Sequence, residues 1–128
     1  MIDNKRKHRA QMTPAEIQAV EELVHSQPSS SWTFGPHAAE RMKAKGVTYE
    51  EAIETLRSGY LVEINENRDL CVVLRNDRGK SSVCVVVSLR TRWFVTTWRN
   101  GKRDRHTTLD ATKYLWDVDV RSIVEAFA

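Results

Sequence analysis

The hydrophobic pattern of the chain changes at Gly59, and this change constrains the fold more than any other feature of the sequence. Beyond Gly59, runs of β-branched and aromatic residues are separated by short polar stretches that are typical of turns. The runs are Tyr60–Glu66, Leu70–Arg75, Ser82–Leu89 and Trp93–Arg99. Connections this short join neighbouring antiparallel strands, so the pattern predicts a four-stranded antiparallel meander sheet.

Helical signals dominate the part of the chain before Gly59. A capping box with proline at the first helical position predicts a helix over residues 13–26. Gly35-Pro36 begins a second helix that ends at Gly46, and a capping box at Thr48 begins a third that ends at Gly59. The expected fold is therefore α+β, with the second and third helices packed on the meander sheet.

The length of 128 residues suits one domain with an extension at each end. Residues 1–30 are expected to form a basic tail and an N-terminal helical extension, joined to the main body by a serine-rich linker. Residues 31–106 form the α+β body, and residues 107–128 form a C-terminal extension. Apolar residues after Asp119 predict a closing helix in that extension, with Asp119 as its cap.

Composition excludes several classes of protein. Charged residues at 29% and hydrophobic residues at 41% describe a soluble globular chain, and no apolar window is long enough to cross a membrane. The basic N-terminus lacks the apolar stretch of a secretory signal, and two cysteines make no disulfide framework. We therefore expect a cytoplasmic protein with no membrane partner.

The net charge of +3 is unevenly distributed along the chain. Residues 13–70 carry ten acidic residues against five basic ones, whereas residues 75–105 carry nine basic residues against two acidic ones. The expected helical half is thus acidic and the expected β half is basic. A phosphate-facing surface and an ordinary solvated basic face both account for this asymmetry.

The hairpin between the second and third expected strands contains both cysteines. A two-residue loop at Asp77-Arg78 would set Cys71 directly across from Cys84. A type I turn with a bulge at Gly79 would instead set Cys84 across from Val72. In either register we expect two buried, unbonded thiols, because free cysteine commonly behaves as a small hydrophobic residue.

His37 is the most suggestive single residue for chemistry. It lies in the first turn of the second expected helix, and Arg41 and Lys45 follow on nearly the same face. Ala38 and Met42 lie beside them and are expected to face the sheet. Histidine is the side chain that titrates near neutrality, and a neighbouring cation favours the neutral form that acts as a base. The alternative is a structural histidine that bonds a backbone carbonyl.

The later strands supply the other polar candidates. On a strand, Arg90 shares a face with Ser88, and Thr97 shares one with Arg99. Converging guanidinium groups suit phosphate because their planar fork bonds two oxygens at once. The tryptophans of these strands are candidates for stacking a base, although aromatic residues in a small sheet more often belong to the core. The basic loop that follows, which either tracks a nucleic-acid backbone or lies in solvent, contains Lys102, Arg103 and Arg105.

Several chemistries have no motif in this sequence. No cysteines or histidines have metal-ligand spacing, so no metal is expected. No glycine-rich phosphate loop is present, so no cofactor is expected either. No nucleophile elbow is present that would indicate a catalytic serine. A metal-free reaction on phosphate, or no reaction at all, remains.

Residues 32–99 resemble an uncharacterised bacterial and phage family of small domains. The resemblance rests on the run FGPHAAERMKAKGVTYEEAIETLRSG and on the strands that end in VVVSLRTRWFVTTW. The family signature is a HAxERM…EE…L helical pair followed by strands, and the family is similar to the BrnT and RelE toxins of the barnase–EndoU–colicin–RelE-like ribonuclease fold. Lys45 stands where the family often has arginine, and the segments over 13–26 and beyond residue 106 lie outside the match.

The resemblance implies two helices on one face of an antiparallel sheet, with nucleic acid on the exposed concave side. It also implies RNA cleavage without a metal, in which the 2′-hydroxyl attacks the adjacent phosphate. His37 would then be the acid or base, with Arg41 beside it at the phosphate. In the same scheme the transition state would be stabilised by Arg90 or Arg92, and the scissile phosphate held by Thr97 and Arg99.

The sequence therefore supports three functions, in a clear order of preference. The first is a metal-independent endoribonuclease of the toxin or effector type that acts on RNA phosphodiesters. The second is a non-catalytic inhibitor or regulator of the phage–host type, with an antitoxin or a host protein as partner. The added helix over 13–26 and the tail that contains Trp116 favour this second function. The third is a nucleic-acid-binding module that uses the basic region 90–105.

Overall fold

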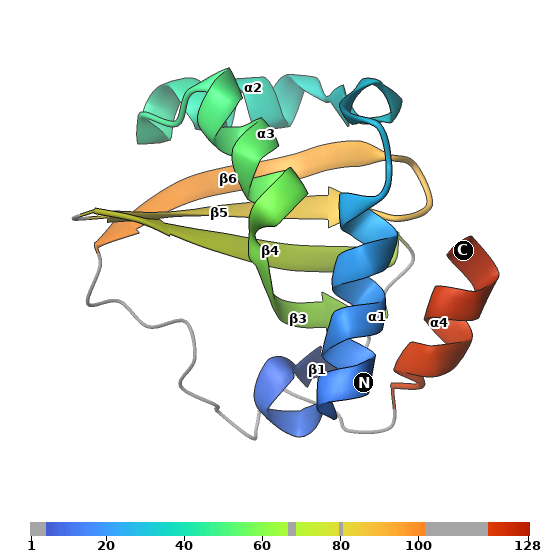
Figure 1. Cartoon of the computed structure of the whole chain (residues 1–128). Coiled ribbons are helices and arrows are strands. Elements are labelled where there is room, and N and C mark those ends of the chain that lie inside the picture. Colours follow the sequence, from blue (N-terminus) through green and yellow to red (C-terminus); the bar gives the residue numbers. More distant parts are fainter. Residues whose placement is uncertain (1–4, 67–68, 80, 102–117) are drawn as a thin grey trace.

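The computed structural model describes residues 5–66, 69–79, 81–101 and 118–128, which form four α-helices and one six-stranded sheet (Figure 1). The helices are α1 (Pro14–His25), α2 (Pro36–Lys45), α3 (Tyr49–Ser58) and α4 (Val120–Phe127). The strands are β1 (Arg6–His8), β2 (Thr33–Phe34), β3 (Tyr60–Asn65), β4 (Cys71–Arg78), β5 (Ser81–Ser88) and β6 (Trp93–Gly101). The fold is therefore α+β, as the sequence predicts.

The sheet has the strand order β1-β3-β4-β5-β6-β2. All neighbours are antiparallel except β2, which pairs parallel with β6. The four expected strands pair in the expected order, but the prediction of a four-stranded, purely antiparallel sheet is wrong. β1 and β2 have only 3 and 2 residues, too few to show a strand period in the sequence. They form because the edges of β3 and β6 offer unpaired backbone groups.

Local signals place the helix ends. Thr13 caps α1 and Thr48 caps α3, and each hydroxyl accepts a hydrogen bond from the backbone N–H three residues on. Gly46 ends α2 with φ of 66°, a left-handed conformation that glycine adopts without steric cost. Asp119 caps α4 as predicted. Within the described ranges, none of the helices has the length and apolar character needed to span a membrane.

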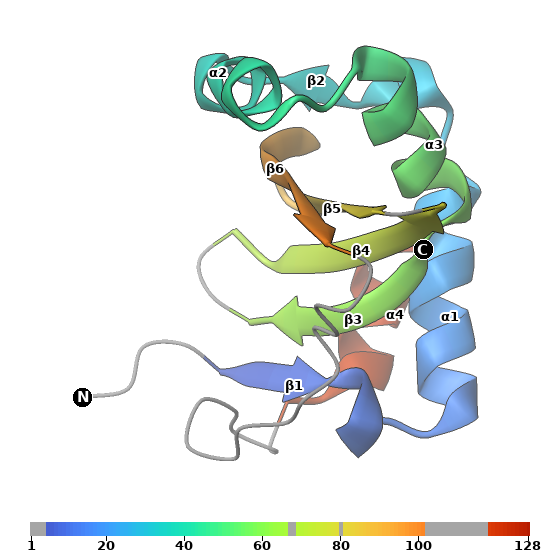
Figure 2. The ribbon, with the colours of Figure 1, turned by 90° about the vertical axis from the view of Figure 1, so that its left-hand side faces the viewer.

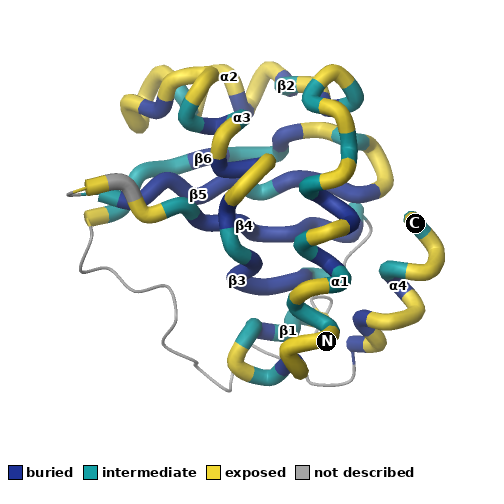
Figure 3. The backbone as a smooth tube through the Cα atoms, in the orientation of Figure 1, coloured by how far each residue is buried: buried dark blue, intermediate teal, exposed yellow. Residues whose placement is uncertain are grey.

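One buried cluster joins the helices to one side of the sheet. Alternate residues of β3 to β6 point into it, including Leu61, Leu74, Val85 and Phe94. Figure 2 shows α1 and α3 on this side, and Figure 3 shows the buried stretches of the strands beneath them. We call it the helix side of the sheet. The opposite side, which we call the far side, carries the paired row Tyr60, Arg75, Cys84 and Trp98.

Both expected extensions pack on the same core as the body. α1 contributes buried valines and a leucine to the cluster, and α4 contributes a valine and an isoleucine. These residues are Val20, Leu23, Val24, Val120 and Ile123. The N-terminal helix is therefore docked on the sheet rather than separated from it by its linker.

The β4–β5 hairpin has a different register from either of the two predicted. Arg78 pairs with Ser81, so the chain turns between these two residues. Cys84 consequently lies opposite Arg75, so both predicted pairings of Cys84 are wrong. The loop forms at Gly79 because a two-residue hairpin loop requires positive φ, and Gly79 takes 60°. Neither cysteine forms a disulfide, and both are buried, as expected.

Candidate functional site

Strand β6 places both of its predicted site residues on the helix side of the sheet. Thr97 and Arg99 lie across from core valines of β5, so they face the helix side. Trp98 lies across from Cys84 and faces the far side, as does Thr96. Thr97 and Arg99 do share a face, as the sequence predicts, but it is the face that the helices cover.

Thr97 and Arg99 are both bonded within the protein. Thr97 is 1% exposed, and its Oγ1 donates to the carbonyl oxygen of Cys84 at 2.7 Å. The guanidinium of Arg99 donates to the carbonyl oxygen of Gly46 at 2.9 Å and to both carboxylate oxygens of Glu51 at 2.6 Å. These contacts join β6 to the helix layer, so their geometry gives no support to the predicted role of holding a phosphate.

The Arg99–Glu51 ion pair links the sheet to α3. The guanidinium of Arg99 and the backbone N–H of Thr48 hold the pKa of the Glu51 carboxyl below its ordinary value. Glu51 is also the reciprocal half of the capping box that begins α3. One carboxylate therefore supports both the start of the helix and its position over β6.

Arg90 and Arg92 lie in the tight connection between β5 and β6. The Ser88 hydroxyl fixes this loop, since it donates to one backbone carbonyl at 2.7 Å and accepts from one backbone N–H at 3.1 Å. The Arg90 guanidinium lies 5.9 Å from the ring centre of Phe127, and that of Arg92 lies 5.2 Å from the ring centre of Trp32. Both cations therefore pack over aromatic rings of neighbouring segments.

His37 and Arg41 are brought together on the exposed side of α2. Arg41 Nε donates to His37 Nε2 at 3.5 Å, across one turn of the helix. Ala38 is fully buried and Met42 packs against the core, as the helical spacing predicts. Lys45 is exposed at the end of the same helix. The surface of α2 thus presents an imidazole with a cation beside it.

Trp93 is half-exposed and lies against the residue that precedes α2. A Cβ atom at Gly35 would lie 3.1 Å from the Trp93 ring, so a side chain there would displace the indole. Gly35 has an ordinary φ of −69° and supplies no side-chain cap to α2. The space for the indole, and not the backbone conformation, therefore requires this glycine. We call His37, Arg41 and Trp93 together the α2 corner.

The α2 corner belongs to the β6 edge of the sheet. Figure 2 shows α2 beyond that edge and displaced away from α1 and α3. Phe94 points into the core on the helix side, so the preceding Trp93 points to the far side. The exposed indole thus lies on the opposite face of β6 from Thr97 and Arg99.

The far side carries a buried polar group that sequence reasoning missed. Arg75 is 2% exposed, its Nε lies 3.1 Å from the Asp77 carboxylate, and its NH1 has no hydrogen-bond partner. The Tyr60 hydroxyl donates to Asp77 at 3.3 Å, and burial raises the pKa of Tyr60. Ser82 Oγ is likewise buried without a partner. Strand alternation would have put Arg75 and Asp77 on one face, but the predicted strand ended at Arg75.

Two basic residues of the expected β half have structural roles. Arg75 and Arg99 form ion pairs within the protein, which removes them from a phosphate-facing surface. The predicted loop residues Lys102, Arg103 and Arg105 lie outside the described residues, as does Trp116. In the part of the chain that is described, no group of three or more His, Cys, Asp or Glu is placed to hold a metal ion.

The comparisons with known proteins identify no relative of this chain. No family model matches the chain, and no match is found among curated proteins or solved structures. The α2 corner is therefore interpreted from its own geometry.

Proposed function

We propose that the protein binds single-stranded RNA at the α2 corner and cleaves it without a metal. The observation that carries the proposal is the exposed hydrogen bond from Arg41 to His37, next to a helix start that seats a half-exposed indole. A neutral imidazole serves as a base, a guanidinium binds phosphate, and an indole stacks a base of any identity. The corner combines these three groups on one edge of the molecule.

The proposed reaction uses the RNA's own 2′-hydroxyl as nucleophile. His37 takes the proton from this hydroxyl as its oxygen attacks the adjacent phosphorus. The bond from phosphorus to the 5′ oxygen breaks, the imidazolium returns the proton to that oxygen, and a 2′,3′-cyclic phosphate remains. Arg41 stabilises the charge that builds up on the phosphate oxygens. Positioned acid–base catalysis of this kind contributes roughly 10²–10⁴-fold to the rate.

The proposal changes the residue set that the resemblance implies. His37 and Arg41 stay in the site, whereas Thr97 and Arg99 leave it because they are bonded on the helix side. A strand bound at the α2 corner and crossing β6 would instead meet Thr96 and Trp98, which face the far side. Arg90 and Arg92 precede β6, in the connection from β5, and suit contacts to the flanking backbone phosphates.

The decisive experiment is cleavage of a mixed-sequence single-stranded RNA in EDTA. We expect products with 2′,3′-cyclic ends, and no cleavage where the 2′-hydroxyl is replaced by hydrogen. His37→Ala is expected to lower the rate about 100-fold or more while binding is retained. Cleavage that continues unchanged in His37→Ala would remove the proposed base.

Matched exposed residues provide the controls for binding. Trp93→Ala is expected to weaken RNA affinity about 10-fold, the size expected for one stacked base, whereas Tyr49→Ala, which removes an equally exposed ring from α3, is expected to leave it unchanged. Arg41→Ala is compared with Lys43→Ala, an exposed cation elsewhere on α2. Affinity should also fall steeply with salt, because phosphate contacts release counterions.

Two outcomes separate the alternatives. Salt-sensitive binding that depends on Trp93 and Arg41, without product from any RNA, would leave a nucleic-acid-binding module. No RNA binding at all would leave the protein-binding regulator as the remaining function.

A further inference from the structure

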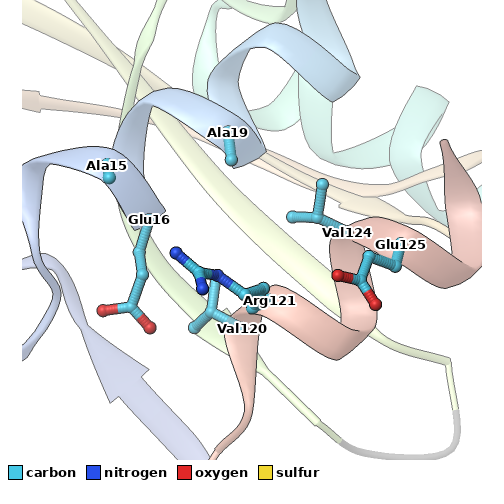
Figure 4. Close-up of a pocket in the computed structure, with 7 residues that line it drawn as sticks. All are labelled: Ala15, Glu16, Ala19, Val120, Arg121, Val124 and Glu125. Carbon is cyan, nitrogen blue, oxygen red and sulfur yellow. The ribbon is translucent and has the colours of Figure 1, made fainter.

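A groove runs between α1 and α4, on a part of the molecule remote in sequence from the α2 corner. It consists of two adjoining cavities of about 340 and 410 Å³, which share Ala19 and Val124 as lining residues. Figure 4 shows the first of them, with Ala15 and Ala19 from α1 facing Val120 and Val124 from α4. Cavities of this size fall in the range that proteins use for binding.

The groove exists because α1 turns small side chains toward α4. The larger apolar residues of α1, Val20, Leu23 and Val24, are buried in the core. Toward α4, the apolar side chains of α1 are the small Ala15 and Ala19 and, in the second cavity, one side of Leu23, which leave space beside α4 unfilled. Val124 of α4 is consequently only partly buried. The floor is therefore apolar and open, and its walls are two ordered helices.

The rim of the groove is acidic. Three carboxylates line the groove, those of Glu16, Glu22 and Glu125, against the one guanidinium of Arg121. Lys7 lies 3.5 Å from Glu16 and offsets part of this charge. The Thr13 backbone N–H nevertheless holds the pKa of Glu16 below its ordinary value, so this carboxylate stays ionised at neutral pH. An apolar floor between carboxylates complements a helix that is apolar on one face and basic on its flanks.

We propose that this groove binds a basic amphipathic helix of a partner protein. Its lining extends along α1 from Ala15 to the C-cap Ser26, which at 1.5 Å per residue is about 17 Å, or roughly three helical turns. The apolar face of the bound helix covers Ala19 and Val124, and its lysines or arginines lie beside Glu22 and Glu125. The proposal is independent of RNA binding, because it uses none of the residues of the α2 corner.

A second copy of this chain is a poorer occupant. α2 is the basic helix of the described chain, with Arg41, Lys43 and Lys45. Its apolar residues, Ala38 and Met42, already pack against the core, so α2 has no apolar face left to insert into a groove. The basic helix of the described residues therefore does not fit, and the occupant that we propose is a helix of another protein.

The test uses a synthetic helix of about three turns, with leucine on one face and lysine and arginine on its flanks. Its binding to the full chain, uniformly labelled with ¹⁵N, is followed by backbone amide shifts. We expect changes centred on Ala15, Ala19 and Val124, and about 10-fold weaker binding when the basic residues of the peptide are replaced by glutamate. His37→Ala is expected to bind the peptide as the wild type does, which separates this test from that of RNA cleavage.

A matched pair of charge-reversal variants makes the test specific. Glu22→Lys combined with Glu125→Lys is expected to weaken peptide binding about 10-fold. Glu50→Lys combined with Glu54→Lys makes the same change in net charge on exposed positions of α3 and is expected to leave binding unchanged. Thermal unfolding of both variants checks that the fold is retained.

Three results would overturn the proposal. The first is equal affinity for the basic and the acidic peptide, and the second is a set of shift changes that map outside α1 and α4. The third is self-association of the wild-type chain that the Glu22/Glu125 variant abolishes, since the occupant would then be a second copy.

Discussion

The two sides of β6 use the same kinds of residue for different purposes. On the helix side, Phe94 stacks on Phe34 with ring centres 4.0 Å apart, and Arg99 is held by Glu51 and a backbone carbonyl. On the far side, Trp93 leaves 49% of its surface exposed. At the same edge of the sheet, Arg41 bonds only to the exposed His37 among the contacts described. Along β6, Phe94 and Arg99 therefore have structural roles, whereas Trp93 keeps an exposed surface that can bind.

The largest expected difference between the two sides is at the adjacent aromatic residues of β6. Phe94→Ala empties a site that is 1% exposed and is expected to lower the free energy of unfolding by about 3–5 kcal/mol. Trp93→Ala, although it removes a larger ring, is expected to cost less than about 1 kcal/mol, because half of that ring is already in water. Urea unfolding of both variants measures the contrast. Equal losses would mean that Trp93 belongs to the core.

Arg99 and Arg41 should also differ in what they contribute to the free energy of unfolding, with Arg99 contributing more. Arg99→Ala removes the hydrogen bonds to Glu51, Gly46 and Ser81 and is expected to lower the free energy of unfolding by about 1–2 kcal/mol, since the side chain is 30% exposed. Arg41→Ala is expected to change it by less than about 0.5 kcal/mol. Chemical denaturation at neutral pH checks both values. A loss in Arg41→Ala as large as that in Arg99→Ala would contradict the assignment of Arg41 to a binding surface.

The Glu51–Arg99 pair on the helix side should also make the stability of the fold depend on pH. The pKa of Glu51 is lower in the folded protein, so its stabilising contribution is complete above the unfolded value of about 4.3 and is lost as the pH falls through the folded value. Glu51→Gln is therefore expected to be less stable than the wild type at pH 7, and this difference should shrink in acid. Unfolding midpoints measured from neutral to acidic pH test this. A difference that stays constant with pH would assign the effect of the substitution to capping alone.

The smallest expected contrast is between the two threonines of β6. Thr97→Val keeps the side-chain shape but removes the hydrogen bond to Cys84, and it is expected to cost about 0.5–1.5 kcal/mol. Thr96→Val, on the half-buried far side, is expected to be neutral within about 0.5 kcal/mol. Thermal unfolding by circular dichroism resolves differences of this size in a chain of this length. A larger loss of stability in Thr96→Val than in Thr97→Val would show that the threonine on the far side has the structural role.

The helix starts and the four long strands could be predicted because their causes are local. Thr13 and Thr48 each cap a helix through a residue three positions away, and Gly46 ends α2 through its own φ. The hydrogen bond between His37 and Arg41 is local too, since it joins adjacent turns of one helix. Such features depend on a few neighbouring residues, which the sequence displays directly.

Sequence reasoning missed the two short strands and the burial of Arg75, which depend on distant partners. β1 forms because β3 offers an edge more than fifty residues away, and the parallel pair of β2 depends on the start of β6 in the same way. Arg75 was counted only as a charge, because its burial depends on packing that the sequence does not display. The β4–β5 register shifted because Gly79, and not Asp77-Arg78, satisfied the positive φ of the loop.

The sequence by itself determined that this chain is α+β, where its helices begin, and that Thr97 and Arg99 share one face of a strand. Only the tertiary structure decided that this face is the one under α3, where Glu51 and Gly46 bond Arg99. The physical reason is that strand alternation separates two faces without saying which is covered. The covered face is set by the packing of α1 and α3, whose apolar stripes need a partner surface. That choice left His37, Arg41 and Trp93 at the surface and made them the candidate site.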